Sequence, residues 1–198
     1  MAEGARQRIL EATQRLLDRQ GGRPLTTRAI ARAAGCSDSA LYKHFPSLDA
    51  LLLEVFKLKL PSFASLLQLA LRVGEHTVED NLAEVLVAGL GFIRSAFPVW
   101  MALATNPPLR KAYFRRLGDE GRGPQRAIDG FAAYLRAEQR VGRVRVDADP
   151  LTVAQLLLAS LVSQVFVEQL MGPNAPAIED RKWSRRVVNA LINGCGTV

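Results

Sequence analysis

The sequence LTTRAIARAAGCSDSALYKHFPSLDALLL, residues 25–53, predicts two short helices joined by a tight turn and followed by the start of a third helix. Gly35 stands where the first helix must end, because a positive φ is inexpensive only for glycine. The second helix carries polar, aromatic and basic side chains and is small enough to enter a DNA major groove. The pattern therefore predicts a helix-turn-helix.

The local sequence signals agree with these two helices. Thr26 or Thr27 can cap the first helix by accepting from a free backbone N–H, and Ser37 can cap the second. Leu41 and Phe45 are spaced i, i+4 and should anchor the second helix inward. The outer side of that helix is left to Ser39, Tyr42 and Lys43.

This segment resembles the DNA-binding signature of the TetR family of bacterial transcriptional regulators. The family pattern is T-x-x-x-I-A-x-x-A-G, a hydrophobe and serine, then L-Y-x-[HY]-F before a short turn and another helix. The matching residues are Thr26, Ile30, Ala31, Ala34, Gly35, Ser37, Leu41, Tyr42, His44 and Phe45. The rest of the chain resembles the family only in length and helical layout.

The resemblance implies an all-α fold with a three-helix helix-turn-helix head on a larger helical body for ligand binding and dimerisation. We expect the head in residues 1–48 and the body in residues 49–198. A length of 198 residues with 48% hydrophobic residues suits one small head and one larger body. The implied function is that of a cytoplasmic, ligand-responsive repressor that binds a palindromic operator.

We assign the expected DNA contacts by side-chain chemistry. Phosphate oxygens are bound by hydroxyl, amide and cationic donors, whereas base edges are reached near the start of the recognition helix. Arg28 suits either role, and Lys43 is assigned to both. The predicted DNA-binding residues are Thr26, Thr27, Arg28, Ser37, Ser39, Tyr42, Lys43 and His44.

Two positions depart from the family pattern. The family often has lysine where this chain has Asp38 and Leu48, and both changes remove positive charge near the DNA. Since each phosphate contact contributes a salt slope of about 0.9, we expect milder salt sensitivity than in a lysine-bearing relative. These two residues are the only hints for an alternative function, a helical ligand-binding or scaffold protein whose head binds DNA weakly.

A second basic segment lies outside the predicted head. Residues 106–145 carry ten arginines or lysines, from Arg110 to Arg145, against four acidic residues. These charges can form solvated helix faces, those of residues 110–116 can add to the positive field over DNA, or the segment can bind an anionic effector. The sequence leaves the three interpretations open.

The remaining segments predict further helices and no paired strands. A helix starting at Ser47 should pass Phe56, with a kink or a new segment at Pro61 before Gly74. Pro98 should kink the longest helix. The other predicted helices span Ala5 to Gln20, Val78 to Thr105, Leu109 to Leu117, Gln125 to Val141, Pro150 to Met171 and Ile178 to Asn193.

In proteins that this chain resembles, the last two helices of two subunits form a four-helix bundle. The apolar residues that this sequence offers for a homodimer are Leu156, Leu157, Leu161, Val165, Leu170, Val187, Val188, Leu191 and Ile192. A two-fold dimer would present recognition helices to half-sites about 34–36 Å apart, or a multiple of that spacing. The alternative is that both helices serve only as intramolecular core.

The resemblance also implies an effector pocket inside the body. The aromatic and sulfur side chains in the helices from Val78 to Met171 suggest, as a set, an apolar or aromatic small molecule. A single aromatic residue at helical spacing is more often ordinary core than pocket lining. The predicted lining residues are Phe92, Phe97, Trp100, Met101, Tyr113, Phe131, Tyr134 and Phe166, with Phe114 as a further candidate.

The sequence argues against an enzyme, a metal site or a cofactor. Only His44 and His76 are present, no Cys/His cluster has zinc spacing, and neither a G-x-S-x-G motif nor a phosphate loop occurs. The two cysteines, Cys36 and Cys195, suit a reducing cytosol. We judge the apolar window from Leu151 to Val167 too short and too polar to span a bilayer, so we expect a buried helix and no membrane partner.

Overall fold

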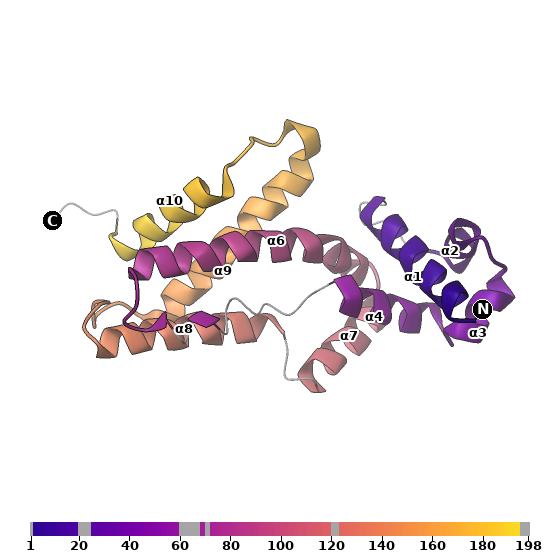
Figure 1. The fold of residues 1–198 in the computed structure, drawn as a ribbon, viewed down its shortest axis with the longest axis horizontal. Coiled ribbons are helices and arrows are strands. Elements are labelled where there is room, and N and C mark those ends of the chain that lie inside the picture. The colour runs from indigo at the N-terminus through magenta and orange to yellow at the C-terminus, as the bar shows by residue number, and fades with distance from the viewer. Residues whose placement is uncertain (1, 20–24, 60–67, 70–71, 120–122, 195–198) are drawn as a thin grey trace. The chain divides into compact units, whose positions relative to one another are not determined.

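The computed structural model describes residues 2–19, 25–59, 68–69, 72–119 and 123–194, and its regular elements in these ranges are all helical (Figure 1). The α-helices are α1 (Ala2–Arg19), α2 (Thr27–Ala34), α3 (Asp38–His44), α4 (Leu48–Lys59), α6 (Val78–Ala104), α7 (Pro107–Asp119), α8 (Pro124–Arg140), α9 (Pro150–Met171) and α10 (Asp180–Ile192). A short 3₁₀ helix, η2 (Gly172–Asn174), follows α9. The all-α prediction is confirmed.

The helix bounds lie close to those predicted from the sequence. The predicted helix from Pro150 to Met171 has the same bounds as α9, and α10 begins at Asp180 rather than at Ile178. Pro98 lies inside α6, which runs from Val78 to Ala104 as one helix. The predicted break at Pro61 lies outside the described residues.

The chain forms two compact units. Unit 1 contains residues 1–61 and 95–120, and unit 2 contains residues 62–94 and 121–198. Helix α6 contributes to both, because Arg94 belongs to unit 2 and Ser95 to unit 1. The predicted boundary between residues 48 and 49 separates a DNA-binding head from a ligand-binding body, which is a different division from that into compact units. It stays a prediction.

Unit 1 is built around α1, which packs against α2, α3 and α4. Ile9 and Leu10 on α1 are 1% and 3% exposed, and Leu51 and Phe56 on α4 are fully buried. Arg6 on α1 forms an ion pair with Glu54 on α4. The same guanidinium lies over the ring of Phe45, 5.1 Å from its centroid. These contacts join α1 to α4 and to the residue that follows α3.

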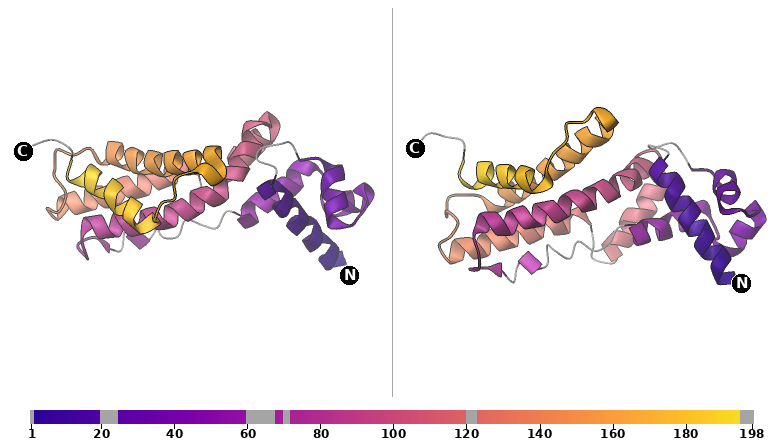
Figure 2. Two further views of the ribbon diagram at one scale, coloured as in Figure 1. Left: turned by 90° about the horizontal axis from the view of Figure 1, so that it is seen from above. Right: turned by 45° about the horizontal axis from the view of Figure 1, so that its top comes forward.

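In unit 2, α8 and α9 lie side by side (Figure 2). Leu82, Leu86 and Leu90 on α6 are buried, and α10 buries Trp183 and Val188. On α8 and α9 the buried side chains are Phe131, Ala132, Tyr134, Leu135, Ala154, Leu157, Leu161 and Val165. Apolar residues at helical spacing therefore form the core of this unit.

A buried polar cluster ties the turn before α6 to α8. Asn81 Nδ2 donates to the Tyr134 hydroxyl and to the carbonyl of Glu75, both at 2.9 Å. The carboxylate of Glu138 accepts from the backbone N–H of Gly74 at 3.3 Å, and its other oxygen lies 3.5 Å from Nε of Arg143. Burial raises the pKa of Tyr134. Tyr134 therefore remains a neutral hydroxyl partner for Asn81.

We expect Tyr134→Phe to lower the free energy of unfolding by about 1–2 kcal/mol, because it removes the hydroxyl that Asn81 contacts in a buried site. Urea denaturation followed by circular dichroism measures this change. The matched control is Tyr42→Phe, since Tyr42 is 49% exposed and should leave stability nearly unchanged. Equal effects of the two substitutions would contradict a structural role for the buried cluster.

Candidate nucleic-acid interface and effector region

Helix α2 and the turn after it have the predicted cap geometry. Thr26, rather than Thr27, caps α2: its Oγ1 accepts from the backbone N–H of Ala29 at 3.3 Å. Gly35 ends the helix with φ 66° and ψ 40°, the left-handed conformation that favours glycine. The Gly35 N–H donates to the carbonyl of Arg32. Thus the turn that separates the two helices depends on one glycine.

Helix α3 is held at its start and on its inner face. The Ser37 hydroxyl accepts from the backbone N–H of Ala40 at 3.2 Å and lies 2.9 Å from the hydroxyl of Ser39. Leu41 is fully buried and Phe45 is 2% exposed, so both anchor α3 as predicted. The cap and the two anchors determine which face of α3 meets solvent.

The outer face of α3 gathers the predicted recognition residues. Ser37, Ser39 and Lys43 are exposed, and Tyr42 is 49% exposed. The Tyr42 hydroxyl lies 3.2 Å from Oγ1 of Thr27, which connects α3 to the first residue of α2. Sequence reasoning did not find this contact, because the two residues are fifteen positions apart and belong to different helices.

The remaining predicted residues lie on or beside the same two helices. Arg28 and Thr26 are exposed, whereas His44 at the end of α3 is half-buried. The charge at the start of α3 is that of Asp38, which is exposed in the first turn. Leu48, the first residue of α4, is half-buried. The exposed cations on α2 and α3 are therefore Arg28, Arg32 and Lys43.

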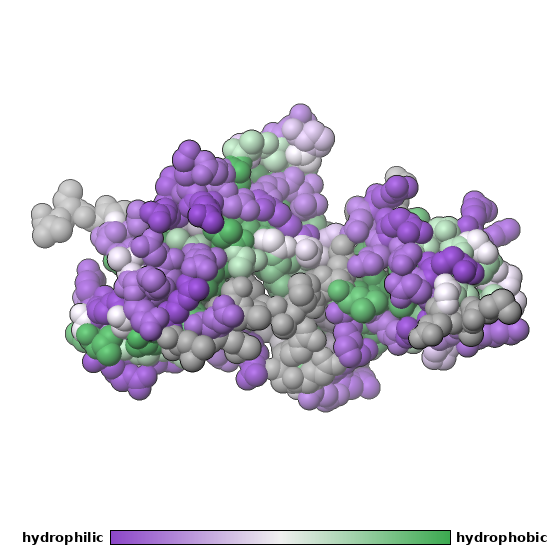
Figure 3. Space-filling model, viewed as in Figure 1, coloured by the Kyte–Doolittle hydropathy of each residue, from purple (hydrophilic) through white to green (hydrophobic). Residues whose placement is uncertain are grey.

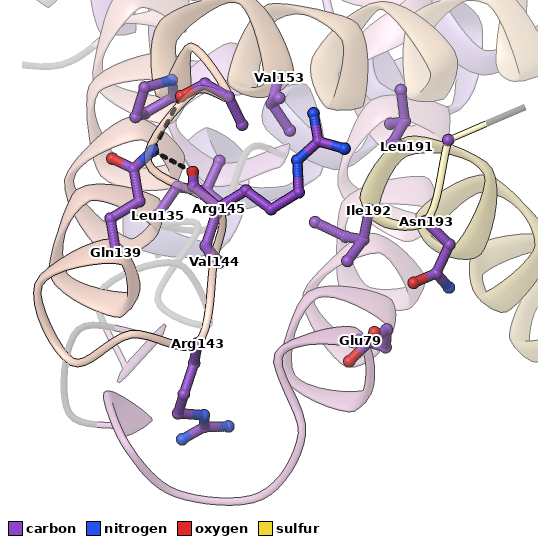
Figure 4. A pocket seen from close by; sticks show the side chains of 13 residues that line it. Glu79, Leu135, Gln139, Arg143, Val144, Arg145, Val153, Leu191, Ile192 and Asn193 are labelled. Carbon is purple, nitrogen blue, oxygen red and sulfur yellow. Dashed lines mark hydrogen bonds between the residues drawn. The ribbon is translucent and has the colours of Figure 1, made fainter. Parts of the chain in front are cut away.

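Unit 2 contains a cleft of about 400 Å³ (Figure 4). The start of α6, the end of α8, the connection to α9, the start of α9 and the end of α10 form its walls. Arg145 extends across it but is paired with Asp147 at 3.0 Å. Gln139 Nε2 donates to the carbonyls of Arg145 and Ala148. The polar groups on this wall mainly hold the connection in place.

The predicted pocket residues do not line this cleft. Phe92, Phe131, Tyr134 and Phe166 belong to unit 2, whereas Phe97, Trp100, Met101 and Tyr113 belong to unit 1. Phe131 and Tyr134 are buried core residues, and Phe166 is 50% exposed on α9. Tyr113 packs edge-on against Phe56 of α4, with ring centroids 5.8 Å apart. Their grouping into one effector pocket stays a prediction.

Helix α9 has two apolar faces. One face is buried in unit 2, and the other is exposed to solvent. The exposed residues are Leu151, Leu156, Val162, Phe166, Val167, Leu170 and Met171, which we call the α9 outer face. The view in Figure 3 is largely hydrophilic, with patches of exposed hydrophobic residues. The expectation of a buried helix was therefore wrong for one side of α9.

The length argument against a membrane span also needs correction. Two helices among the described residues, Val78–Ala104 and Pro150–Asn174, are long and apolar enough to cross a membrane by length and composition alone. Core helices of soluble proteins pass the same test. Of their most apolar windows, 39% and 22% are buried within the protein, so length alone decides nothing about their surroundings.

Comparison with known families covers most of the chain. Residues 9–55 match the bacterial regulatory proteins of the tetR family, and residues 93–193 match the C-terminal domain of AefR-like transcriptional repressors. Over 42 residues, the chain is 45% identical to the nucleoid occlusion factor SlmA of Marinomonas sp. (strain MWYL1). That match covers 21% of each protein.

Solved structures share the fold over nearly the whole chain. A TetR family regulator from Pseudomonas syringae pv. tomato str. DC3000 has a TM-score of 0.68 at 22% identity and 95% coverage of both chains. FadR from Bacillus subtilis, in complex with stearoyl-CoA, has a TM-score of 0.63 at 18% identity, with 96% and 99% coverage. A regulator from Saccharomonospora viridis in complex with choline has a TM-score of 0.65 at 24% identity, and the match covers 96% of this chain and 95% of that one.

The capped α2, the glycine turn and the anchored α3 on a helical body define a helix-turn-helix transcription regulator. The chain belongs to the TetR family, with an AefR-like C-terminal domain. It is a DNA-binding transcriptional regulator and not an enzyme, and membership of the family implies operator DNA as a partner.

We expect Asp38→Lys to strengthen binding to a nonspecific DNA duplex and to steepen its salt dependence, because a cation replaces an exposed anion at the start of α3. One added phosphate contact changes the slope of log K against log salt by about 0.9. Leu48→Lys should act in the same direction. Fluorescence anisotropy over a salt series measures the slope.

The matched control for this charge change is Asp129→Lys, at an exposed position of α8 in unit 2. If Asp129→Lys steepened the slope as much as Asp38→Lys, the effect would reflect net charge rather than a contact at α3.

Proposed function

We propose that this protein is a ligand-responsive repressor that binds a palindromic operator as a homodimer and releases it on binding a small apolar or aromatic effector. The observation that carries the proposal is the polar face of α3, held outward by the buried anchors Leu41 and Phe45. The match of residues 93–193 to an AefR-like repressor domain supports repression rather than activation. The protein acts in the bacterial cytoplasm, where operator DNA lies.

The DNA contacts of the proposal are those expected from the sequence. Thr27, Tyr42, Lys43 and His44 position phosphates, while Ser37, Ser39 and Lys43 face base edges. The contact between the hydroxyls of Thr27 and Tyr42 supports a shared phosphate site, because it brings two donors from different helices together. Residues 1–48 form the head in this assignment.

A second basic surface supports the head electrostatically. Arg110, Lys111 and Arg115 on α7 are exposed and belong to unit 1, the unit that contains α2 and α3. Their charges add to a positive field that attracts DNA. This placement favours the field interpretation over an anionic effector for residues 110–116.

The homodimer forms through α9 and α10. The α9 outer face supports this, because its apolar side chains need a partner that excludes water. A two-fold axis places the same face of a second copy against it. Helix α10 contributes the half-buried Val187, Leu191 and Ile192.

Effector binding acts by a population shift. A ligand that binds one arrangement of the body more tightly moves the equilibrium toward it, and DNA is released when the two heads no longer match the half-site spacing. The stearoyl-CoA of the Bacillus subtilis relative supports an effector with a large apolar part. The predicted pocket aromatics are the candidate lining.

The decisive experiment uses DNA from upstream of the protein's own gene. We expect DNase I footprinting to reveal a palindromic protected site with half-sites about one helical turn, or a multiple of it, apart. Failure to retard any such fragment even at low salt would favour the alternative, a ligand-binding or scaffold protein with a weakened head.

The dimer assignment predicts that Leu156→Glu and Val162→Glu, both on the α9 outer face, produce monomers, because each would bury a carboxylate in the interface. Operator affinity should fall at least tenfold with the loss of the second head. Sedimentation velocity and gel retardation measure the two effects. The matched control is Val146→Glu, at a position that is 87% exposed outside α9, and a dimer that survives both α9 substitutions would contradict the assignment.

A further inference from the structure

Three helices of unit 2 meet at one guanidinium. Arg94 on α6 donates to Glu168 on α9 from Nε at 2.8 Å and from Nη2 at 2.9 Å. It donates to Asp180 on α10 from Nη1 at 2.7 Å and from Nη2 at 2.9 Å. Four of the five N–H groups of Arg94 are used, and both carboxylates are bound in bidentate fashion. We call these three residues the Arg94 hub.

The hub is shielded but not fully buried. The side chains of Arg94, Glu168 and Asp180 are 33%, 17% and 31% exposed. Gln164 on α9 also donates to Glu168, at 3.1 Å. The hydrogen bonds from Arg94 hold the pKa of Glu168 below its ordinary value, whereas the charge of Asp180 acts to raise it. The cluster therefore combines the attraction between Arg94 and the two carboxylates with the repulsion between Glu168 and Asp180.

The geometry makes Arg94 necessary for the approach of two like charges. Without it, the carboxylates near the end of α9 and at the start of α10 would repel each other in a partly shielded site. A lysine could not replace it, because an ammonium group is a point charge and cannot bind two carboxylates by parallel pairs of hydrogen bonds. The arrangement thus requires the planar fork of arginine.

The hub lies beside the surface that the proposed dimer uses. Glu168 is in the last turn of α9, on the side of the buried Leu161 and Val165, and the same turn carries Leu170 and Met171 of the α9 outer face. Asp180 is the first residue of α10, which follows η2 and a short connection (Figure 1). The last turn of α9 and the first turn of α10 are therefore fixed to α6 by the same side chain.

We propose that Arg94 is a positioning residue for dimerisation, which sets α9 and α10 in the geometry that the homodimer requires although it lies on α6. The inference rests on the proposed function, because it presupposes a homodimer formed through α9. The proposed interface would then depend on Arg94, a residue of α6 that the apolar spacing of α9 and α10 does not indicate.

The test compares Arg94→Lys and Arg94→Gln with the wild-type protein by sedimentation velocity over a concentration series. Both variants should weaken the dimer at least tenfold. The matched control is Arg185→Gln, since Arg185 on α10 also pairs with a carboxylate on α6, Asp80, at 2.8 Å. That pair is 69% and 51% exposed, so its loss should change dimer affinity less than twofold.

The pH profile separates positioning from a general loss of stability. In Arg94→Gln the Glu168 carboxylate loses the hydrogen bonds that lower its pKa and keeps the neighbouring charge that raises it. It therefore takes up a proton at a higher pH than in the wild-type protein, and the variant dimer should become tighter as pH falls from 7 toward the ordinary pKa of a glutamate, about 4.3. In the wild-type protein Glu168 has a lowered pKa, so the hub is intact at neutral pH and is lost only as pH falls through that lowered pKa. The wild-type dimer should therefore not tighten over this range.

A triple variant removes the repulsion directly. Arg94→Gln combined with Glu168→Gln and Asp180→Asn should recover most of the dimer affinity that Arg94→Gln loses. If Arg94→Gln alone does not fold, the triple variant and Arg94→Lys still test the proposal.

The possible outcomes distinguish the two proposals. A wild-type monomer would overturn the proposed dimer and this inference with it. A wild-type dimer that Arg94→Lys leaves unchanged, or an Arg94→Gln dimer without the reversed pH response, would overturn the inference alone.

Discussion

The burial of Leu41 and Phe45 is the constraint on which the DNA-binding head depends. A helix as short as α3 gains little from its own hydrogen bonds, so its position comes from packing. With these two side chains buried, Tyr42 and Lys43 must face outward. The left-handed Gly35 supplies the turn that brings α3 against α2, and the contact between Thr27 and Tyr42 joins their outer edges. One packing choice thus decides the recognition surface.

In unit 2 the corresponding constraint lies in α9, a helix with apolar residues on two sides. Leu157, Leu161 and Val165 place one side of α9 in the core of unit 2, and the opposite side remains exposed. Exposed apolar patches of this kind mark interaction sites, and the proposed homodimer would cover this one. The Arg94 hub joins the end of that helix to α6 and to the start of α10.

Much of the fold could be predicted, because helix signals are local. The cap at Ser37, the stop at Gly35 and the bounds of α9 follow from neighbouring residues and agree with the structure. The choice of Thr26 over Thr27 as the cap could not be made, since adjacent threonines offer the same hydroxyl. Buried and exposed aromatics could not be separated either, because Phe131 and Phe166 both occur at helical spacing among apolar neighbours, yet Phe131 is fully buried and Phe166 is 50% exposed.

The sequence by itself determined the family, the all-α class and the residues of α3 that face away from its anchors. These properties depend on the spacing of residues within short segments, which is visible in the sequence itself. The tertiary structure alone decided that α9 has an exposed apolar face, that Tyr42 contacts Thr27, and that Arg94 binds Glu168 and Asp180. Arg94 is 74 and 86 positions from its two partners, and no local pattern encodes a contact between helices at such separations.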